Sequence, residues 1–183
     1  MIADLLGATT TFDDLTLPFA AVTTDIATAR PHVIDRGDLM PALLASAAIP
    51  GIFPAVDHDG RRLYDGGVVA NVPVRQAWAM GARSLVVLDC TFPGHVLPPP
   101  ETLAEVLLFT AMVTMRSQAI LEAPLVAEHI PVVYLPGPVA QRISPFHFDD
   151  TDVLIEGAYE AARPFLEDLH VDGPGLYGSL SER

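Results

Sequence analysis

The chain has 183 residues, and its 23 acidic and 10 basic side chains give a formal net charge of −13. Half of the residues are hydrophobic, which indicates a packed globular protein and argues against a disordered chain. The negative charge disfavours nucleic acid as a partner because it repels the phosphate backbone, and it disfavours an anionic membrane surface for the same reason.

Cysteine content and apolar patterning indicate the compartment. The one cysteine, Cys90, cannot form an internal disulfide, which fits a reducing environment. The N-terminus lacks the basic region of a signal peptide. The longest apolar stretch, Leu103 to Met115, contains Glu105 and is shorter than the ~20 residues that span a bilayer. We therefore expect a cytoplasmic protein without a transmembrane segment.

The first predicted elements are a buried strand at 19–24, a loop or hairpin at 25–37 and a helix that starts at Leu39 and ends before Pro50. Asp38 is the predicted N-cap of this helix. The helix should present one apolar face, formed by Leu39, Leu43, Leu44 and Ala47. A turn at 58–60 then leads into a short strand before Asp65.

The second half of the chain continues the alternation of helices and strands. After Pro73 we predict a helix that ends near Gly81, a core strand at 84–89, a long helix at 101–122, a third core strand at 131–135 and a last helix from about residue 151. This order predicts an α/β fold with a mainly parallel sheet covered on both faces. No composition shift marks a second domain, so residues 1–183 are expected to form one, with a loose tail at 172–183.

No residue of the chain has the setting of a serine or cysteine nucleophile. The tight strand-to-helix turn of an α/β hydrolase reads Gly-x-Ser-x-Gly, and none of the six serines has glycine on both sides at that spacing. Ser46 lies in a helical pattern, so we predict a structural role with its hydroxyl bonded to the preceding turn. Cys90 has no glycine elbow and no nearby histidine, which favours a buried, inert thiol.

The sequence also gives no sign of a metal or a nucleotide cofactor. Its six histidines show no metal-ligand spacing, and His58 between two aspartates lies in a hairpin where alternate side chains point in different directions. The chain has no Gly-x-Gly-x-x-Gly or Walker loop. We predict neither a metal nor a cofactor.

The most informative run is Leu63 to Pro73, in which Asp65-Gly66-Gly67 follows a strand and Asn71-x-Pro73 precedes a helix. Alone, Asp-Gly-Gly is a common turn. Here Ala-Ser-Ala-Ala-Ile-Pro-Gly-Ile-Phe-Pro precedes it at 45–54, and Met-Gly-Ala and Leu-Val-Val-Leu-Asp follow at 80–82 and 85–89. In this order the segments resemble the patatin-like phospholipase family. The runs 144–149 and 155–163 resemble the C-terminal helix of its bacterial members, so the resemblance covers about 12–168.

The resemblance implies a three-layer α/β/α sandwich and a lipid acyl hydrolase with a Ser–Asp dyad. In such an enzyme the serine attacks an ester carbonyl, the aspartate takes its proton, and a glycine-rich loop stabilises the oxyanion. Asp65 matches the catalytic base, and Gly66 and Gly67 would let the backbone turn sharply and approach the active site closely. The family's N-terminal strand, nucleophile elbow and oxyanion loop precede the matched region. We therefore expect a truncated domain that is inactive alone.

Two alternatives remain open at this point. The chain could be a catalytically dead patatin-like module that binds lipid or a protein partner, or a separate chain could supply the elbow. The family resemblance implies a lipid or acyl-ester substrate. A parallel sheet without its first strands would also expose an apolar edge, which invites association with another chain.

Overall fold

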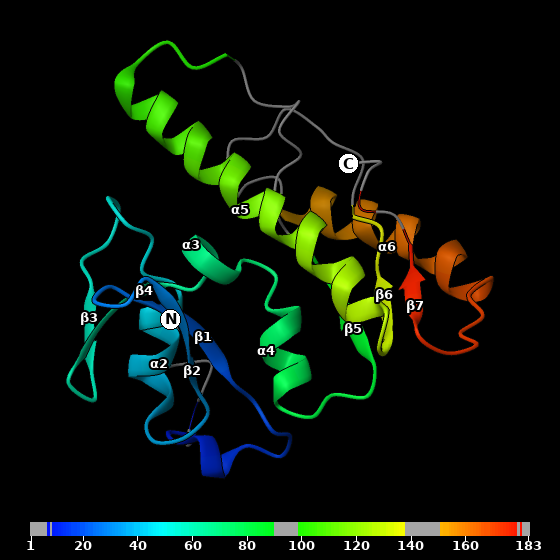
Figure 1. The fold of residues 1–183 in the computed structure, drawn as a ribbon, viewed down its shortest axis with the longest axis horizontal. Helices are drawn as coiled ribbons and strands as arrows, with labels where there is room; N and C mark the ends of the chain where they lie inside the picture. The colour runs from blue at the N-terminus through cyan, green and yellow to red at the C-terminus, as the bar shows by residue number, and fades with distance from the viewer. Residues whose placement is uncertain (1–6, 8, 90–98, 138–150, 179, 181–183) are drawn as a thin grey trace. The chain divides into compact units, whose positions relative to one another are not determined.

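The computed structural model describes residues 7, 9–89, 99–137, 151–178 and 180 (Figure 1). The chain divides into two units, Met1–Pro73 and Val74–Arg183, and each is described by itself. The prediction of one partial domain over 1–183 stays a prediction, since a domain can comprise two such units.

The first unit holds a four-stranded antiparallel sheet with the order β2-β1-β4-β3. Its elements are η1 (Phe12–Asp14), β1 (Ala21–Asp25), β2 (Arg30–Ile34), α2 (Leu39–Ser46), β3 (Val56–His58), β4 (Arg61–Asp65) and α3 (Gly67–Ala70). The prediction of a mainly parallel sheet is wrong for this unit. Short turns join β1 to β2 and β3 to β4, and connections of that length produce antiparallel neighbours.

Helix α2 packs against this sheet through a face that differs from the predicted one. The buried residues of the helix are Leu39, Ala42 and Ala45, whereas Leu44 is 47% exposed. Alanines at this interface allow the helix to lie close to the strands. Asp38 is at the N-cap position as predicted, but its side chain makes no capping hydrogen bond. The core that results contains Phe12, Ala21, Ile34, Leu39, Ala42, Ala45 and Leu63.

The second unit holds a three-stranded parallel sheet with the order β5-β6-β7. Its elements are α4 (Val74–Ala79), β5 (Leu85–Val87), α5 (Leu103–Ala127), β6 (Pro131–Tyr134), α6 (Thr151–Glu167) and β7 (Gly175–Tyr177). The prediction of a parallel sheet is confirmed for this unit alone. Among the described residues β5 is an edge of this sheet, and association through a sheet edge stays a prediction.

The predicted loose tail contains the third strand of this sheet. Strand β7 pairs with β6 in parallel, with Val133 opposite Tyr177. The next residue, Gly178, has φ +106°, and a Cβ atom there would collide with the carbonyl of Tyr134. The expectation of a loose tail is therefore wrong at 175–178, because a three-residue strand surrounded by glycines gives no periodic signal.

Helix α5 is longer than predicted and bears on the question of a membrane segment. It continues to Ala127, with Pro124 inside it, although the sequence predicted an end near Glu122. The segment Glu105–Ala127 has 23 residues and a mean hydropathy of 1.3, so it is long and apolar enough to cross a bilayer. Core helices of soluble proteins meet the same two criteria. The absence of a transmembrane segment therefore stays a prediction.

Candidate functional site

Asp65 is the last residue of β4, opposite Thr23 of β1. Both of its backbone polar groups bond to residues far away in the sequence. The Asp65 N–H donates to the carbonyl of Ala48 at 2.9 Å. The Asp65 carbonyl accepts from Oγ1 of Thr24 at 2.7 Å, and Thr24 is only 5% exposed. The backbone that carries the candidate base is thus fixed on both sides of its Cα atom.

The carboxylate of Asp65 is partly buried and has one bonded oxygen. Its Oδ1 accepts from the Gly67 N–H at 2.7 Å. Among the described residues, Oδ2 has no hydrogen bond or ion pair. Burial raises the pKa of Asp65 above its ordinary value of 3.8, and the Gly67 hydrogen bond offsets part of that rise. A carboxylate with a raised pKa and an unbonded oxygen can accept a proton from a neighbouring hydroxyl.

Glycine is required at position 66 because of a close contact with β1 and not because of its backbone angles. Its φ of −62° and ψ of −24° are ordinary helical values, so the predicted need for glycine to form a sharp turn is wrong at this position. The structure shows a close approach of Gly66 to β1, and the predicted close approach to the active site stays a prediction. A Cβ atom on Gly66 would lie 2.6 Å from the carbonyl carbon of Val22 and 3.1 Å from the nitrogen of Thr23. Gly67 begins α3 and is buried.

Ser46, the last residue of α2, bonds to the same part of β1. Its Oγ donates to the carbonyl oxygen of Val22 at 2.8 Å. The prediction that this hydroxyl bonds to its own preceding turn is therefore wrong. The acceptor lies 24 residues away in the sequence, and it is the carbonyl against which Gly66 packs. The end of α2 and the turn after β4 thus meet at one peptide group of β1.

Comparison with known proteins finds a family match for the first part of the chain. A family model for patatin-like phospholipase matches residues 4–78. The chain is 37% identical over 79 residues to patatin-like phospholipase domain-containing protein 7 of Mus musculus, which is 42% of this chain and 6% of that protein. It is 36% identical over 80 residues to lysophospholipase NTE1 of Mycosarcoma maydis, with 44% and 4% covered. This chain carries part of a patatin-like domain.

The match with this family is partial on both sides. An uncharacterized NTE family protein of Mycobacterium bovis is 36% identical over 73 residues, which is 40% of this chain and 20% of that relative. The chain thus spans a minor part of the relatives that it matches. Asp65, Gly66 and Gly67 lie inside the patatin-like segment 4–78. The predicted resemblance from 79 to 168 lies beyond the family match and stays a prediction, as does the catalytic role of Asp65.

The other candidates from the sequence are Cys90, the run 144–149 and a metal site. Cys90 and the run 144–149 lie outside the described residues. In the part of the chain that the structure describes, no three His, Cys, Asp or Glu side chains are placed to hold a metal ion. The expected absence of a metal stays a prediction.

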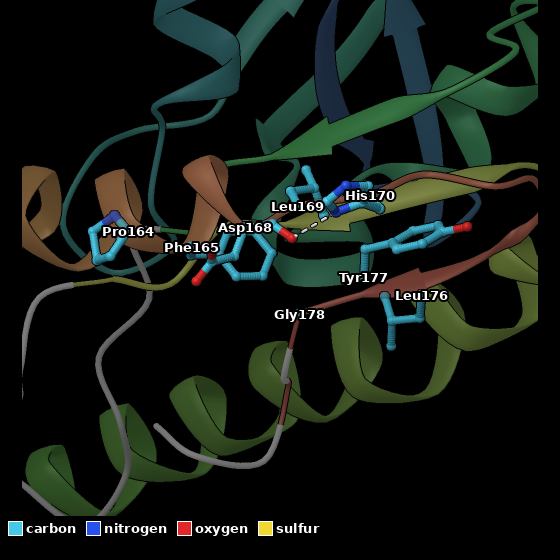
Figure 2. Close-up of a pocket in the computed structure, with 8 residues that line it drawn as sticks. All are labelled: Pro164, Phe165, Asp168, Leu169, His170, Leu176, Tyr177 and Gly178. Atoms are coloured by element: carbon cyan, nitrogen blue, oxygen red, sulfur yellow. Dashed lines mark hydrogen bonds between the residues drawn. The ribbon is translucent and has the colours of Figure 1, made fainter.

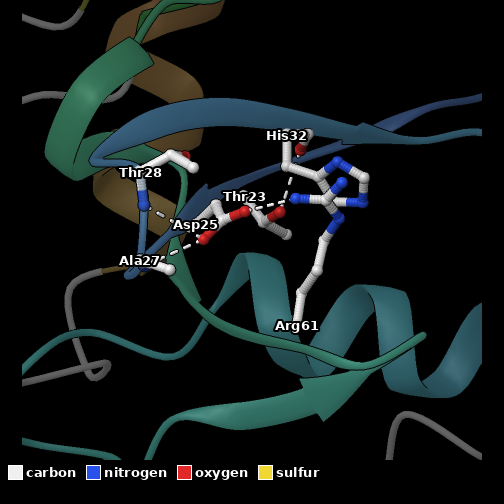
Figure 3. Close-up of polar contacts among 6 residues, drawn as sticks. All are labelled: Thr23, Asp25, Ala27, Thr28, His32 and Arg61. Carbon is white, nitrogen blue, oxygen red and sulfur yellow. Dashed lines mark hydrogen bonds and ion pairs between the residues drawn. The ribbon is translucent and has the colours of Figure 1, made fainter.

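A polar cluster that no pattern in the sequence indicated lies at the C-terminal end of β1 (Figure 3). Asp25 is 4% exposed and forms an ion pair with Arg61, the first residue of β4. Its Oδ1 also accepts from the N–H groups of Ala27 at 2.9 Å and Thr28 at 3.4 Å. Burial acts to raise the pKa of Asp25, but the hydrogen bonds from Arg61 and the two N–H groups outweigh it and lower the pKa. The cluster closes the β1–β2 hairpin.

The structure also has a pocket in the second unit (Figure 2). Its volume is about 660 Å³, and it is lined by Pro164, Phe165, Asp168, Leu169, His170, Leu176, Tyr177 and Gly178. Two of its polar side chains bond to nearby backbone. Nδ1 of His170 lies 3.0 Å from the carbonyl oxygen of Asp168, and the Tyr177 hydroxyl donates to the carbonyl of Gly173 at 2.9 Å. None of the predicted site residues lines this pocket.

Proposed function

We propose that the patatin-like segment supplies the general base of a Ser–Asp lipid acyl hydrolase, and that Asp65 is this base. One observation carries the proposal. The Asp65 carboxylate lies at the end of β4 with Oδ1 held by Gly67 and with Oδ2 unbonded among the described residues, inside the segment 4–78 that matches the family. The names of the relatives, a patatin-like phospholipase and a lysophospholipase, support a lipid or acyl-ester substrate.

In the proposed reaction, Asp65 first accepts a proton from the serine and then donates it to the leaving alcohol. Its carboxylate takes the proton from the serine hydroxyl while the serine oxygen bonds to the ester carbonyl carbon. When the tetrahedral intermediate collapses, the carbon–oxygen bond to the alcohol breaks and Asp65 returns the proton to that alcohol. Water then hydrolyses the acyl-enzyme with Asp65 again as the base. The raised pKa of Asp65 brings its basicity closer to neutral pH, which favours this role.

We infer from the sequence pattern that the nucleophile is not among these 183 residues. No serine of the chain has glycine at both flanking positions of the elbow, and the hydroxyl of Ser46 is bonded to Val22. The proposal therefore includes inactivity of this chain alone. It also includes the three-layer α/β/α sandwich as the complete fold, which the parallel order β5-β6-β7 and the contacts of α5 with β6 and β7 support.

Two experiments test the proposal. The purified 183-residue chain should neither react with a fluorophosphonate probe nor hydrolyse p-nitrophenyl acyl esters, and a labelled serine would identify a nucleophile that the sequence pattern does not reveal. The DNA upstream of the Met1 codon is the second test, because an in-frame Gly-x-Ser-x-Gly there would favour a truncated enzyme. In a protein extended by that sequence, Asp65→Asn should lower ester turnover by about 10²- to 10⁴-fold with the fold intact. Full turnover by this variant, or no upstream elbow, would favour a catalytically inactive lipid- or protein-binding module.

A further inference from the structure

The hydroxyl of Thr24 adds a side-chain hydrogen bond to the contact between β1 and β4 at the last residue pair of the two strands. In the strand register, Thr23 lies opposite Asp65 and Thr24 lies opposite Tyr64. Strand β4 ends at Asp65, where the chain turns into α3. At that point a side chain provides the donor, because Oγ1 of Thr24 bonds to the Asp65 carbonyl at 2.7 Å.

The bond from Thr24 restrains the peptide group between residues 65 and 66, and this peptide group influences how the Asp65 carboxylate is held. The carboxylate has its bond to the N–H of Gly67, two residues further along the chain. The direction of that N–H depends on the orientation of the peptide between residues 65 and 66, whose carbonyl is the one that Thr24 holds. The N–H of Asp65 is fixed separately by Ala48. Without the Thr24 hydroxyl, contact with Val22 would still restrict the position of Gly66, but nothing described would bond to the Asp65 carbonyl.

We propose that Thr24 is a positioning residue for Asp65: the Thr24 hydroxyl fixes the peptide after Asp65, so that the Gly67 N–H stays directed at Oδ1. The importance of this role for catalysis rests on the proposed function of Asp65. The geometry itself does not depend on that function. The Thr24 hydroxyl bonds to the backbone carbonyl of Asp65 and not to its carboxylate, so its effect on the carboxylate is indirect.

The amide proton of Gly67 reports this arrangement directly. Because it bonds to Oδ1, its NMR chemical shift should change as Asp65 ionises, and Asp65→Asn should abolish that change and so identify it. In the 183-residue chain, we expect Thr24→Val to reduce this pH-dependent shift by at least about half and to speed hydrogen exchange of the Gly67 amide by roughly 2- to 10-fold, the range for one lost hydrogen bond. Thr24→Ser, which retains the hydroxyl, should keep both signals.

Thr23 provides the matched control. It is also fully buried, and its Oγ1 bonds to the carbonyl of His32 at 2.9 Å on the neighbouring strand. Thr23→Val should therefore remove a comparable bond and leave the Gly67 titration unchanged. An unchanged Gly67 titration in Thr24→Val would overturn the proposal. If Thr24→Val does not fold, loss of the Gly67 titration in Thr24→Ser would overturn it, because packing and not the hydroxyl would then be responsible.

The outcome of this NMR experiment does not depend on whether the protein is an active enzyme. If Asp65 is not a catalytic base, the Gly67 titration and its dependence on the Thr24 hydroxyl remain as expected. If Thr24 has no positioning role, the titration is the same in every Thr24 variant, whatever the activity of an extended protein.

Discussion

The backbone at Gly66 lies directly against the peptide group of Val22, so close that a Cβ atom on Gly66 would be 2.6 Å from the Val22 carbonyl carbon. The Val22 carbonyl oxygen also accepts the hydroxyl of Ser46 at 2.8 Å. One peptide group of β1 therefore contacts the turn that carries Asp65 and the end of α2. Substitution of Gly66 or Ser46 should therefore disturb the surroundings of Asp65 without altering its carboxylate.

Gly66→Ala should destabilise the chain by about 1–3 kcal/mol, because the added methyl group meets backbone that cannot move aside like a flexible side chain. The free energy of unfolding from urea denaturation measures the effect. Val68→Ala is the control, since Val68 lies in the same short helix and is 37% exposed, and it should change stability by no more than about 0.5 kcal/mol. Equal stability of Gly66→Ala and the natural chain would show that the turn can move away from β1.

Asp65→Asn should make the chain more stable near pH 7. The folded-state pKa of Asp65 is raised above the unfolded value of 3.8, so Asp65 contributes stability below 3.8 that is lost as the pH rises through the folded pKa. Asparagine keeps an oxygen that can accept the Gly67 N–H and is never ionised. The gain should therefore shrink near pH 3, where Asp65 is protonated in both states. Urea denaturation of both chains at the two pH values measures it, and a gain that does not depend on pH would contradict the role of ionisation.

Local patterns in the sequence predicted the elements around the site well. The short apolar run before Asp65 is β4, the run 19–24 overlaps β1, and the helix from Leu39 is α2. Their boundaries depend on residues close together in the chain, such as Asp38 before the helix and Gly60 in the hairpin turn. The resemblance to patatin-like proteins made Asp65 a candidate base because the segments 45–54, 63–73 and 80–89 follow one another in the order of that family.

The contacts that hold the site could not be predicted in this way. Ser46 finds its acceptor 24 residues away, and Thr24 finds Asp65 at a separation of 41. A single sequence carries no signal for such pairs, so the Ser46 hydroxyl was assigned to its own helix. The antiparallel arrangement was missed for a different reason. The alternation of strands and helices describes the chain as a whole, but the relative direction of two paired strands depends on the length of the connection between them. The short turns after β1 and β3 make these two strand pairs antiparallel.

Ser46→Ala should lower stability by about 0.5–1.5 kcal/mol, because the Val22 carbonyl loses a donor from the end of α2. Thermal unfolding followed by circular dichroism measures the loss. The same variant should leave fluorophosphonate reactivity unchanged from the natural chain, since Ser46 is assigned a structural role. If the natural chain is labelled and Ser46→Ala is not, Ser46 is a nucleophile and the structural assignment is wrong.

Arg61→Met should lower the free energy of unfolding near pH 7 by more than removal of an exposed ion pair does, because Asp25 is 4% exposed and would lose its charged partner, although Arg61 itself is 47% exposed. The folded-state pKa of Asp25 is lowered below 3.8, so its contribution is present above 3.8 and is lost as the pH falls toward the folded value. The difference between the two chains should therefore narrow in acid. Urea denaturation near pH 7 and near pH 3 measures both effects.

Arg62→Met is the matched control for that prediction. Arg62 lies next to Arg61 in β4 and pairs with Asp57 at 3.6 Å, but both side chains of this pair are exposed, at 71% and 80%. Solvent screens such a pair, so its removal should change stability by about 0–1 kcal/mol with little dependence on pH. Similar losses for the two arginine variants would mean that burial of Asp25 does not strengthen its ion pair. A large loss for Arg61→Met alone would show that the ion pair with Asp25 stabilises the contact between β1 and β4.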